Sequence, residues 1–209
     1  MSVETISALA TGVGTLILAI ATFFATSSAN RAARTAELAM QIDQRPLLMA
    51  SKLSDERQKI MFADDYWVHV DGGGAWFEYR NGVIYFVLSV RNVGRGLAVM
   101  QAWMPHPERR NAAYPHADVN QFRPHTRDLY VASGDIGLWQ GALRDPAADE
   151  QQAFAEAVQA RRPVSVDVLY SDADGGQRTI TRFGVIAADK GGWVSSVVRH
   201  WRLDGTDPR

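Results

Sequence analysis

Hydrophobic and polar positions divide the chain into two regions with different patterns. The first region is a run of 26 uncharged residues, 5–30, between Glu4 and Arg31. From Leu47 onward, short runs of alternating apolar and polar residues are separated by Gly, Pro, Asn and Asp. The first pattern is typical of a membrane-spanning helix, and the second predicts a domain of short β-strands.

The uncharged region is long enough to form an uncleaved membrane anchor over residues 1–30. A bilayer core of about 30 Å is crossed by about 20 largely apolar residues in a helix, and residues 6–26 supply them. The alternative is a cleaved signal peptide, because residues 25–29 contain weak small-residue cleavage sites. Signal peptides begin with basic residues, whereas this chain has none before the apolar run and carries Glu4. The flanking residues therefore favour the anchor.

Arg31 and Arg34 follow the anchor directly, and basic residues close to a span tend to stay in the cytoplasm. We therefore expect a single-pass plasma-membrane protein, with its N-terminus outside and its C-terminal domain in the cytoplasm. Residues 31–46 are rich in helix formers, so a helical stalk is expected to continue from the anchor. Pro46 ends this stalk, because the residue before a proline is disfavoured in a helix.

Small residues recur along one face of the anchor at alternating steps of four and three. Small side chains let helix backbones approach closely in lipid, which suggests a homo-oligomer or docking onto a partner membrane helix. The alternative is that Ala, Gly, Thr and Ser fill more than half of this stretch, so that some register looks regular by composition alone. The residues predicted to self-associate are Ala8, Gly12, Thr15 and Ala19.

Residues 47–209 suit one globular domain of ordinary size. The formal net charge of the chain is -1, so no nucleic-acid partner is expected, and the lipid bilayer is the partner that the sequence indicates. The chain has no cysteine, which excludes disulfides, thiolate catalysis and cysteine-bound zinc. No cofactor is expected.

The domain reads as mainly β. Residues 83–92 have the pattern of a central strand, with the even-numbered residues from Ile84 to Val90 on one face. Residues 164–170 and 177–186 flank a turn sequence and predict a hairpin. Asp145 and Pro146 predict the start of an inserted helix over about residues 146–161. Weaker strand candidates are residues 47–53, 57–62, 66–70, 75–79, 97–103, 128–132 and 193–203.

These elements predict an N-terminal transmembrane helix and helical stalk, followed by an immunoglobulin-like antiparallel β-sandwich with one inserted helix. The domain boundaries are residues 1–30 for the anchor, 31–46 for the stalk and 47–209 for the sandwich. The Asn92-Val93-Gly94-Arg95-Gly96 stretch follows a strand without matching any phosphate-binding fingerprint. We interpret it as a tight turn or bulge whose glycines supply positive φ angles.

Several short motifs support this architecture. They are the anchor and Ala-rich stalk, Arg45-Pro46-Leu47, residues 90–98 (Val-Arg-Asn-Val-Gly-Arg-Gly-Leu-Ala), Leu138-Trp139-Gln140-Gly141, Arg178-Thr179-Ile180 and Arg199-His200-Trp201. In these motifs the chain resembles a group of uncharacterised bacterial membrane proteins with an N-terminal span and a β-rich domain. The resemblance implies the same architecture and no particular activity.

Residues 104–128 are expected to form a long loop. Long loops are often functional, so this segment is the most chemically suggestive one in the chain. Three histidines there could bind zinc, although their spacings match no zinc template. Its arginines could hold a phosphorylated ligand or lipid headgroups, or could simply fix the loop through carboxylates and carbonyls. Trp139 is either a core residue or an exposed anchor for a partner. The candidate contact residues are His106, Arg109, Arg110, His116, Arg123, His125, Arg127 and Trp139.

Three functions are compatible with these features, and the preferred one is a membrane-anchored binding or scaffolding module. The first alternative is a membrane-tethered enzyme that uses the His and Arg loop on a phosphorylated or ester substrate. The second is an oligomerising sensor of the envelope or lipid surface. No catalytic residue and no metal ligand is assigned, because no nucleophile, base or carboxylate pair can be recognised.

Overall fold

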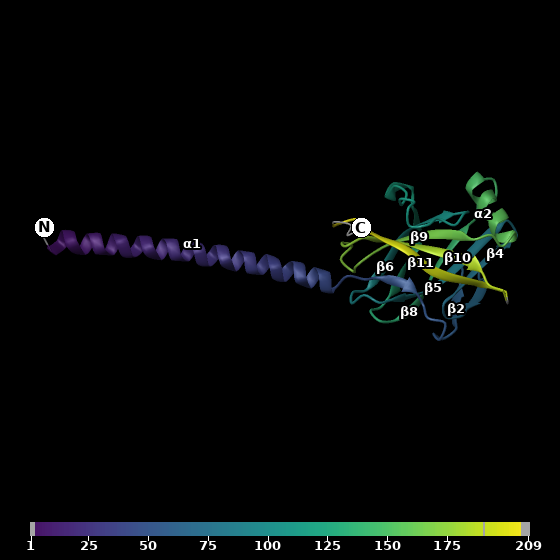
Figure 1. The fold of residues 1–209 in the computed structure, drawn as a ribbon, viewed down its shortest axis with the longest axis horizontal. Helices are drawn as coiled ribbons and strands as arrows, with labels where there is room; N and C mark the ends of the chain where they lie inside the picture. The colour runs from purple at the N-terminus through teal and green to yellow at the C-terminus, as the bar shows by residue number, and fades with distance from the viewer. Residues whose placement is uncertain (1–2, 190, 206–209) are drawn as a thin grey trace. The chain divides into compact units, whose positions relative to one another are not determined.

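The structure is a computed structural model that describes residues 3–189 and 191–205, with the backbone alone for residues 3–10, 38 and 41–43. The chain divides into two compact units, Met1–Asp43 and Gln44–Arg209. Among the described residues, the first unit is a single helix and the second contains all the strands (Figure 1).

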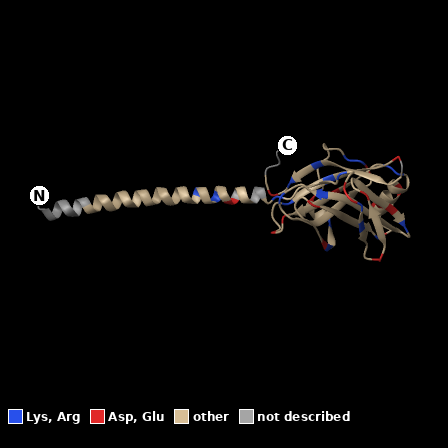
Figure 2. Ribbon diagram, turned by 90° about the horizontal axis from the view of Figure 1, so that it is seen from below, with Lys and Arg blue, Asp and Glu red and all other residues tan. Residues whose placement is uncertain are grey.

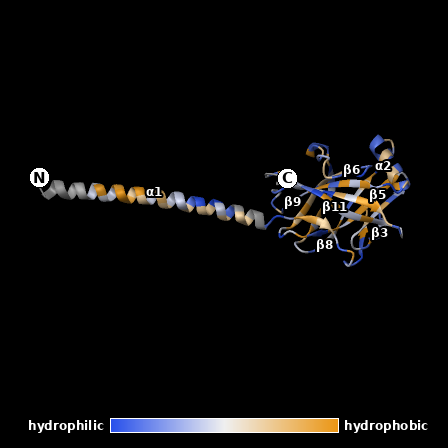
Figure 3. Ribbon diagram, in the orientation of Figure 1, coloured by the Kyte–Doolittle hydropathy of each residue, from blue (hydrophilic) through white to orange (hydrophobic). Residues whose placement is uncertain are grey.

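Helix α1, Val3–Asp43, is continuous through the predicted anchor and stalk. Within it, Thr11–Glu37 is long and apolar enough to cross a membrane, with a mean hydropathy of 1.6 in its most apolar window, although a signal sequence has the same properties. Figure 3 shows the apolar residues gathered in the earlier part of this helix and the hydrophilic ones toward its C-terminal part. The helix ends before Pro46, as the sequence predicts.

The second unit is mainly β, and nine of its described strands form one curled antiparallel sheet. The sheet order is β1-β5-β4-β11-β10-β9-β6-β7, with β8 also paired to β5, while β2 and β3 form a separate hairpin. The strands are β1 Leu48–Ala50, β2 Gln58–Met61, β3 Trp67–Val70, β4 Gly74–Arg80, β5 Val83–Asn92, β6 Ala98–His106, β7 Arg123–Val131, β8 Ile136–Leu143, β9 Val164–Ser171, β10 Thr179–Ala187 and β11 Trp193–Arg202.

The sheet curls at a weak corner. β4 pairs with β11 only through Ala75–Trp193 and Gly74–Val194, whereas β4 and β5 pair along six positions. The apolar inner faces of both halves therefore meet in one core, which includes Phe86, Trp139 and Val166. Helix α2, Asp149–Gln159, packs Phe154 against Phe77 and Phe86 at the rim of this core. The pairing gives one curled sheet, and the immunoglobulin-like arrangement stays a prediction.

The outer face of each half of the curled sheet is also covered. The β2–β3 hairpin packs Val68 and Val70 against Tyr85 and Val87 of β5. Residues 107–122, which include the short 3-10 helix Val119–Gln121, place Phe122 against the apolar outer surface of β9 and β10. β5 is therefore buried on two faces, as its continuous apolar pattern predicts.

The structure corrects four expectations. β8 was not predicted as a strand, because Gly137 and Gly141 interrupt its pattern. β6 and β7 reach into residues 104–128, so the loop is shorter than expected. Helix α2 begins at Asp149 with Ala148 as N-cap rather than after Asp145. Gly94 and Gly96 do not have positive φ angles, so backbone conformation does not explain why glycine stands at these two positions.

That reason is close approach of the segment that leads into the domain. A Cβ on Gly96 would lie 1.7 Å from the carbonyl oxygen of Gln44, and a Cβ on Gly94 would lie 2.3 Å from that of Arg45. Asn92, fully buried, accepts a hydrogen bond from the Leu47 amide at 3.0 Å through Oδ1. The turn after β5 thus packs closely against residues 44–47, the segment that leads into the domain, and holds it by a hydrogen bond.

We expect Gly96→Ala to lower the free energy of unfolding of the domain by about 1–3 kcal/mol, the usual effect of overpacking. Urea unfolding of the full chain in detergent, followed by tryptophan fluorescence, measures this because all six tryptophans lie beyond residue 44. Gly176→Ala is the matched control, since its new Cβ would meet nothing closer than 3.7 Å. Equal midpoints for the two variants would contradict the tight contact.

Candidate functional site

The three histidines of the predicted loop lie in three different environments. His106 on β6 contacts Asp167 of β9, His116 packs its ring against Trp201, and the His125 ring contacts Trp139. Over residues 3–189 and 191–205, no group of three His, Asp or Glu side chains is arranged to hold a metal ion. The three histidines are close together in the sequence, but the fold separates them.

A buried ionic cluster lies on the outer face of the sheet under residues 107–122. Arg182 on β10 donates two hydrogen bonds of 2.7 Å to the Asp167 carboxylate, and both side chains have no exposed surface. His106 Nε2 lies 3.1 Å from Asp167 Oδ2 and is 2% exposed. Burial would raise the pKa of Asp167, but its hydrogen bonds with Arg182 and His106 outweigh burial and hold that pKa below its usual value.

This cluster fixes the covering loop to the sheet. The Arg182 guanidinium also donates to the carbonyl oxygens of Tyr114 at 2.8 Å and Pro115 at 3.1 Å. Arg199 on β11 donates to the carbonyl oxygen of Ala112 at 2.9 Å. The sequence interpretation that arginines anchor this loop is right in kind, but these arginines come from β10 and β11.

Arg123 and Arg127, two arginines of the predicted loop, lie on β7 and contact other parts of the domain. Arg123 pairs with Glu150 of α2, and Arg127 donates to the carbonyl oxygen of Met61 at 3.3 Å. Arg110 contacts Glu108 and, through its amide, Ser165, whereas Arg109 is exposed. The predicted contact residues therefore divide between two faces of the domain.

His125, Arg127 and Trp139 come together at an open seam between β7 and β8. These strands follow each other in sequence with only residues 132–135 between them, a connection that ordinarily joins paired strands. Among the described strands, however, β7 pairs with β6 and β8 pairs with β5, and no ladder joins β7 to β8. Residues 125–128 bulge out of the β6 pairing, because Leu129 and Pro124 are opposite Met100 and Ala102. We call this gap between the two edge strands the seam.

Among the residues that the structure describes, one hydrogen bond between side chains joins β7 to β8 beside the hollow. The Trp139 indole Nε1 donates to His125 Nε2 at 3.0 Å. An indole nitrogen is only a donor, so His125 Nε2 carries no proton and the neutral ring holds its proton on Nδ1. Burial, with a smaller contribution from Arg127, lowers the pKa of His125 to about 4. His125 is therefore a neutral donor at pH 7 and is poorly suited to act as a general base.

The seam contains a hollow of about 190 Å³. Its apolar wall includes Phe62, Trp103 and Leu129, and Arg127 and Arg144 contribute guanidinium groups. Arg144 donates to Asp64 at 3.0 Å, and this hydrogen bond lowers the pKa of Asp64, which is therefore ionised at pH 7. Two guanidiniums and one carboxylate leave one net positive charge at the hollow.

Gln140 on β8 also lines the hollow. Its side-chain oxygen is buried and has no hydrogen-bond partner among the described residues. A buried acceptor without a partner costs about 1–3 kcal/mol. This oxygen has almost no accessible surface, so a ligand would recover that energy only after the Gln140 side chain turns toward the hollow. The seam thus combines positive charge, an unused acceptor and an apolar wall.

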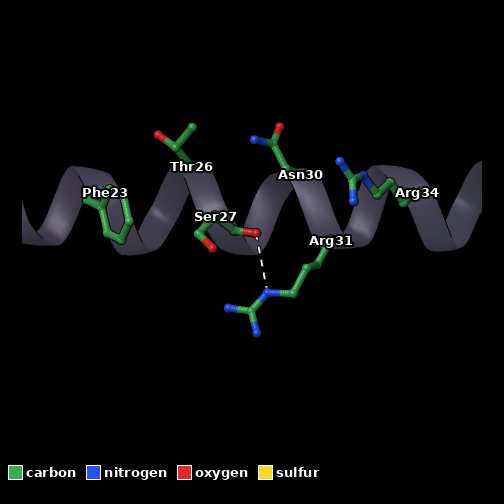
Figure 4. A pocket seen from close by; sticks show the side chains of 6 residues that line it. All are labelled: Phe23, Thr26, Ser27, Asn30, Arg31 and Arg34. Carbon is green, nitrogen blue, oxygen red and sulfur yellow. Dashed lines mark hydrogen bonds between the residues drawn. The ribbon is translucent and has the colours of Figure 1, made fainter.

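Trp139 itself is fully buried, so of the two alternatives for this residue it is a core residue and not an exposed anchor for a partner. Sequence reasoning missed Gln140 and Arg144 because nothing in their local pattern marks them. A second hollow is lined by α1 alone, through residues such as Phe23 and Arg34 (Figure 4). It is the side of one helix, where the Arg31 Nε donates to the carbonyl oxygen of Ser27 at 3.4 Å.

Comparisons with known proteins add no functional assignment. No protein-family model and no curated protein matches the chain. Among solved structures, a crystal structure described as an ApaA protein from Bordetella pertussis matches 79% of this chain and 98% of that chain, with 9% sequence identity and a TM-score of 0.25. Values this low support no conclusion about fold or function. The resemblance to bacterial membrane proteins stays a prediction.

We expect Arg182→Met to lower the free energy of unfolding by about 3–5 kcal/mol, because it leaves the Asp167 carboxylate buried without its main partner. Urea unfolding measures the loss, and faster proteolysis within residues 107–122 should accompany it. Arg109→Met is the control, because this exposed arginine lies in the same loop, and it should change stability by less than about 0.5 kcal/mol. Similar effects of the two substitutions would contradict the role of the cluster.

The pKa of His125 predicts a pH dependence of stability. Its folded pKa of about 4 lies below the ordinary value of 6.5, so unfolding takes up a proton between these pH values. The stabilisation is full above pH 6.5 and falls, by about 3 kcal/mol in all, as the pH decreases to 4. In His125→Gln, which keeps an acceptor for the indole, the decrease should be smaller by about that amount. His69→Gln, at an exposed histidine, should retain the wild-type slope, and equal slopes in all three proteins would refute this assignment.

Proposed function

We propose that the protein is a single-pass membrane protein that holds a binding module at the cytoplasmic surface of the plasma membrane. The observation that carries the proposal is α1, whose candidate span has none of the residues of its most apolar window buried. Leu18 and Phe23 are 69% and 71% exposed, so these side chains need an apolar environment. Figure 2 agrees with this, because the coloured part of the helix shows no charged residue until the blue and red positions toward its C-terminal part. In the sequence the charges after residue 10 begin with Arg31, Arg34 and Glu37.

Three threonine hydroxyls of the candidate span are compatible with lipid. Thr15 donates its hydroxyl to the carbonyl oxygen of Thr11 at 2.9 Å, and Thr22 donates to that of Leu18 at 2.8 Å. Thr26 makes the same contact with Thr22 at 2.8 Å. Each hydroxyl proton is therefore satisfied within the helix, as a bilayer requires.

The seam supports a binding role better than a catalytic one. The histidines are separated, and His125 is neutral with its lone-pair nitrogen occupied by the Trp139 indole. What the seam offers is a small hollow with a net positive charge. The immunoglobulin-like character of the domain is part of this proposal, supported by a sheet that curls around one core.

Alkaline carbonate extraction of cells that express the chain with a C-terminal tag tests the anchor. We expect the intact chain in the membrane pellet and a version that begins at Leu47 in the supernatant. The mass of the purified protein distinguishes the signal-peptide alternative, since cleavage near residues 25–29 would remove the span and overturn the proposal. Added protease should leave the tag intact in whole spheroplasts and remove it after lysis, and removal from whole spheroplasts would place the domain outside.

A further inference from the structure

We propose that the seam binds a small monoanionic carboxylate that carries a neighbouring N–H group, as found at the C-terminus of a peptide or in an N-acylated amino acid. This inference rests on the proposed function, because it names the ligand class of the same binding module. It concerns the domain alone, so it is tested separately from the membrane anchor.

The charge of the seam selects the anion. Arg127 and Arg144 both line the hollow, and each is partly engaged already, with the carbonyl oxygen of Met61 and with Asp64. One net positive charge remains, which suits one carboxylate better than a doubly charged phosphate. Guanidinium groups bind carboxylates through short charge-assisted hydrogen bonds, and His125 lies in the same lining.

The unpaired oxygen of Gln140 determines which group the ligand carries beside its carboxylate. The Gln140 side-chain oxygen has no partner among the described residues, while the other polar groups named in the lining are donors. Once the Gln140 side chain turns this buried oxygen toward the hollow, a ligand N–H close to the carboxylate satisfies it as the arginines hold the acid. Carboxylate and N–H stand beside each other in this way at the last residue of a peptide chain.

Size and surroundings limit the rest of the ligand. The volume of about 190 Å³ is below the roughly 300–1,000 Å³ of pockets for drug-sized molecules, so the hollow admits a chain end or a small acid. Phe62, Trp103 and Leu129 provide an apolar wall for one short side chain. Because β8 pairs on one side only among the described strands, a peptide that ends in the hollow has a strand edge along which to continue.

The first experiment titrates N-acetyl-alanine into the purified full chain in detergent and follows tryptophan fluorescence, since Trp103 lines the hollow. We expect saturable binding of the acid and at least tenfold weaker binding of its methyl ester, which lacks the charge. Equal binding of acid and ester, or no binding of the acid and of a tetrapeptide with a free C-terminus, would overturn the proposal. Tighter binding of inorganic phosphate than of N-acetyl-alanine would also overturn it.

Two sources of the same chemistry are distinguished in the same titration. Tighter binding of the free-acid tetrapeptide than of N-acetyl-alanine, with loss of that gain on C-terminal amidation, supports a peptide terminus that extends along β8. Equal affinity of the two acids supports a free small acid. Both results retain the carboxylate class.

Matched variants locate the site. Arg144→Gln and Arg127→Gln should each weaken N-acetyl-alanine binding about tenfold or more, since each removes a charged hydrogen bond. Arg109→Gln, an exposed arginine on residues 107–122, should leave binding unchanged. An equal loss in all three variants would indicate nonspecific attraction and overturn the assignment to the seam.

Gln140→Leu provides a test that does not depend on charge. Loss of the unpaired buried acceptor should leave the domain as stable as the wild type or more stable, while acid binding becomes weaker by about fivefold or more. A variant that is weaker in binding only because it is unfolded would lower both values. Unchanged binding in a stable Gln140→Leu protein would show that the N–H requirement is wrong.

Discussion

The buried side chain of Asn92 joins three segments that are far apart in the sequence. Its Oδ1 accepts from the Leu47 and Gly94 amides, and its Nδ2 donates to the carbonyl oxygens of Gly96 and Val131. Its backbone accepts from the amide of Gly134 and donates to the carbonyl of Asp135. The start of the domain, the end of β5 and the β7–β8 connection are therefore positioned by one residue. Such a network is costly to leave incomplete, because each buried group without a partner loses its hydration.

The local pattern predicted the elements with strong periodicity. β5 is observed with the predicted bounds. A strand with apolar residues on both faces is stable only when both faces are buried, which is the position of a central strand. The predicted hairpin is formed by β9 and β10, and in its register Asp167 is opposite Arg182. Counting outward from the predicted turn, residues 172–176, would place Asp167 opposite Thr181. The observed register is shifted by one residue, so the ion pair depends on the actual connection and could not be inferred from the turn alone.

The seam could not be inferred from the sequence either. Consecutive strands with a short connection ordinarily pair, and nothing in the sequence indicates that β7 and β8 remain apart. Their separation results from the curl of the sheet, which brings its two edges near each other without joining them. The neutral state of His125 likewise depends on Trp139 across the seam, so it is a property of the tertiary structure. Residue type indicated candidate chemistry here, but only long-range packing shows which groups act together.

The close packing of the turn after β5 against residues 44–47 also has a mechanical consequence. A pulling force applied at Gln44 first reaches the contacts with Gly94 and Gly96, then the three residue pairs between β1 and β5. Because Asn92 bonds to both Leu47 and Val131, the same force is transmitted to the connection that closes one end of the β7–β8 gap. A single amide side chain thus connects the start of the domain to one end of that gap, and tension on the start of the domain would reach the gap along this path.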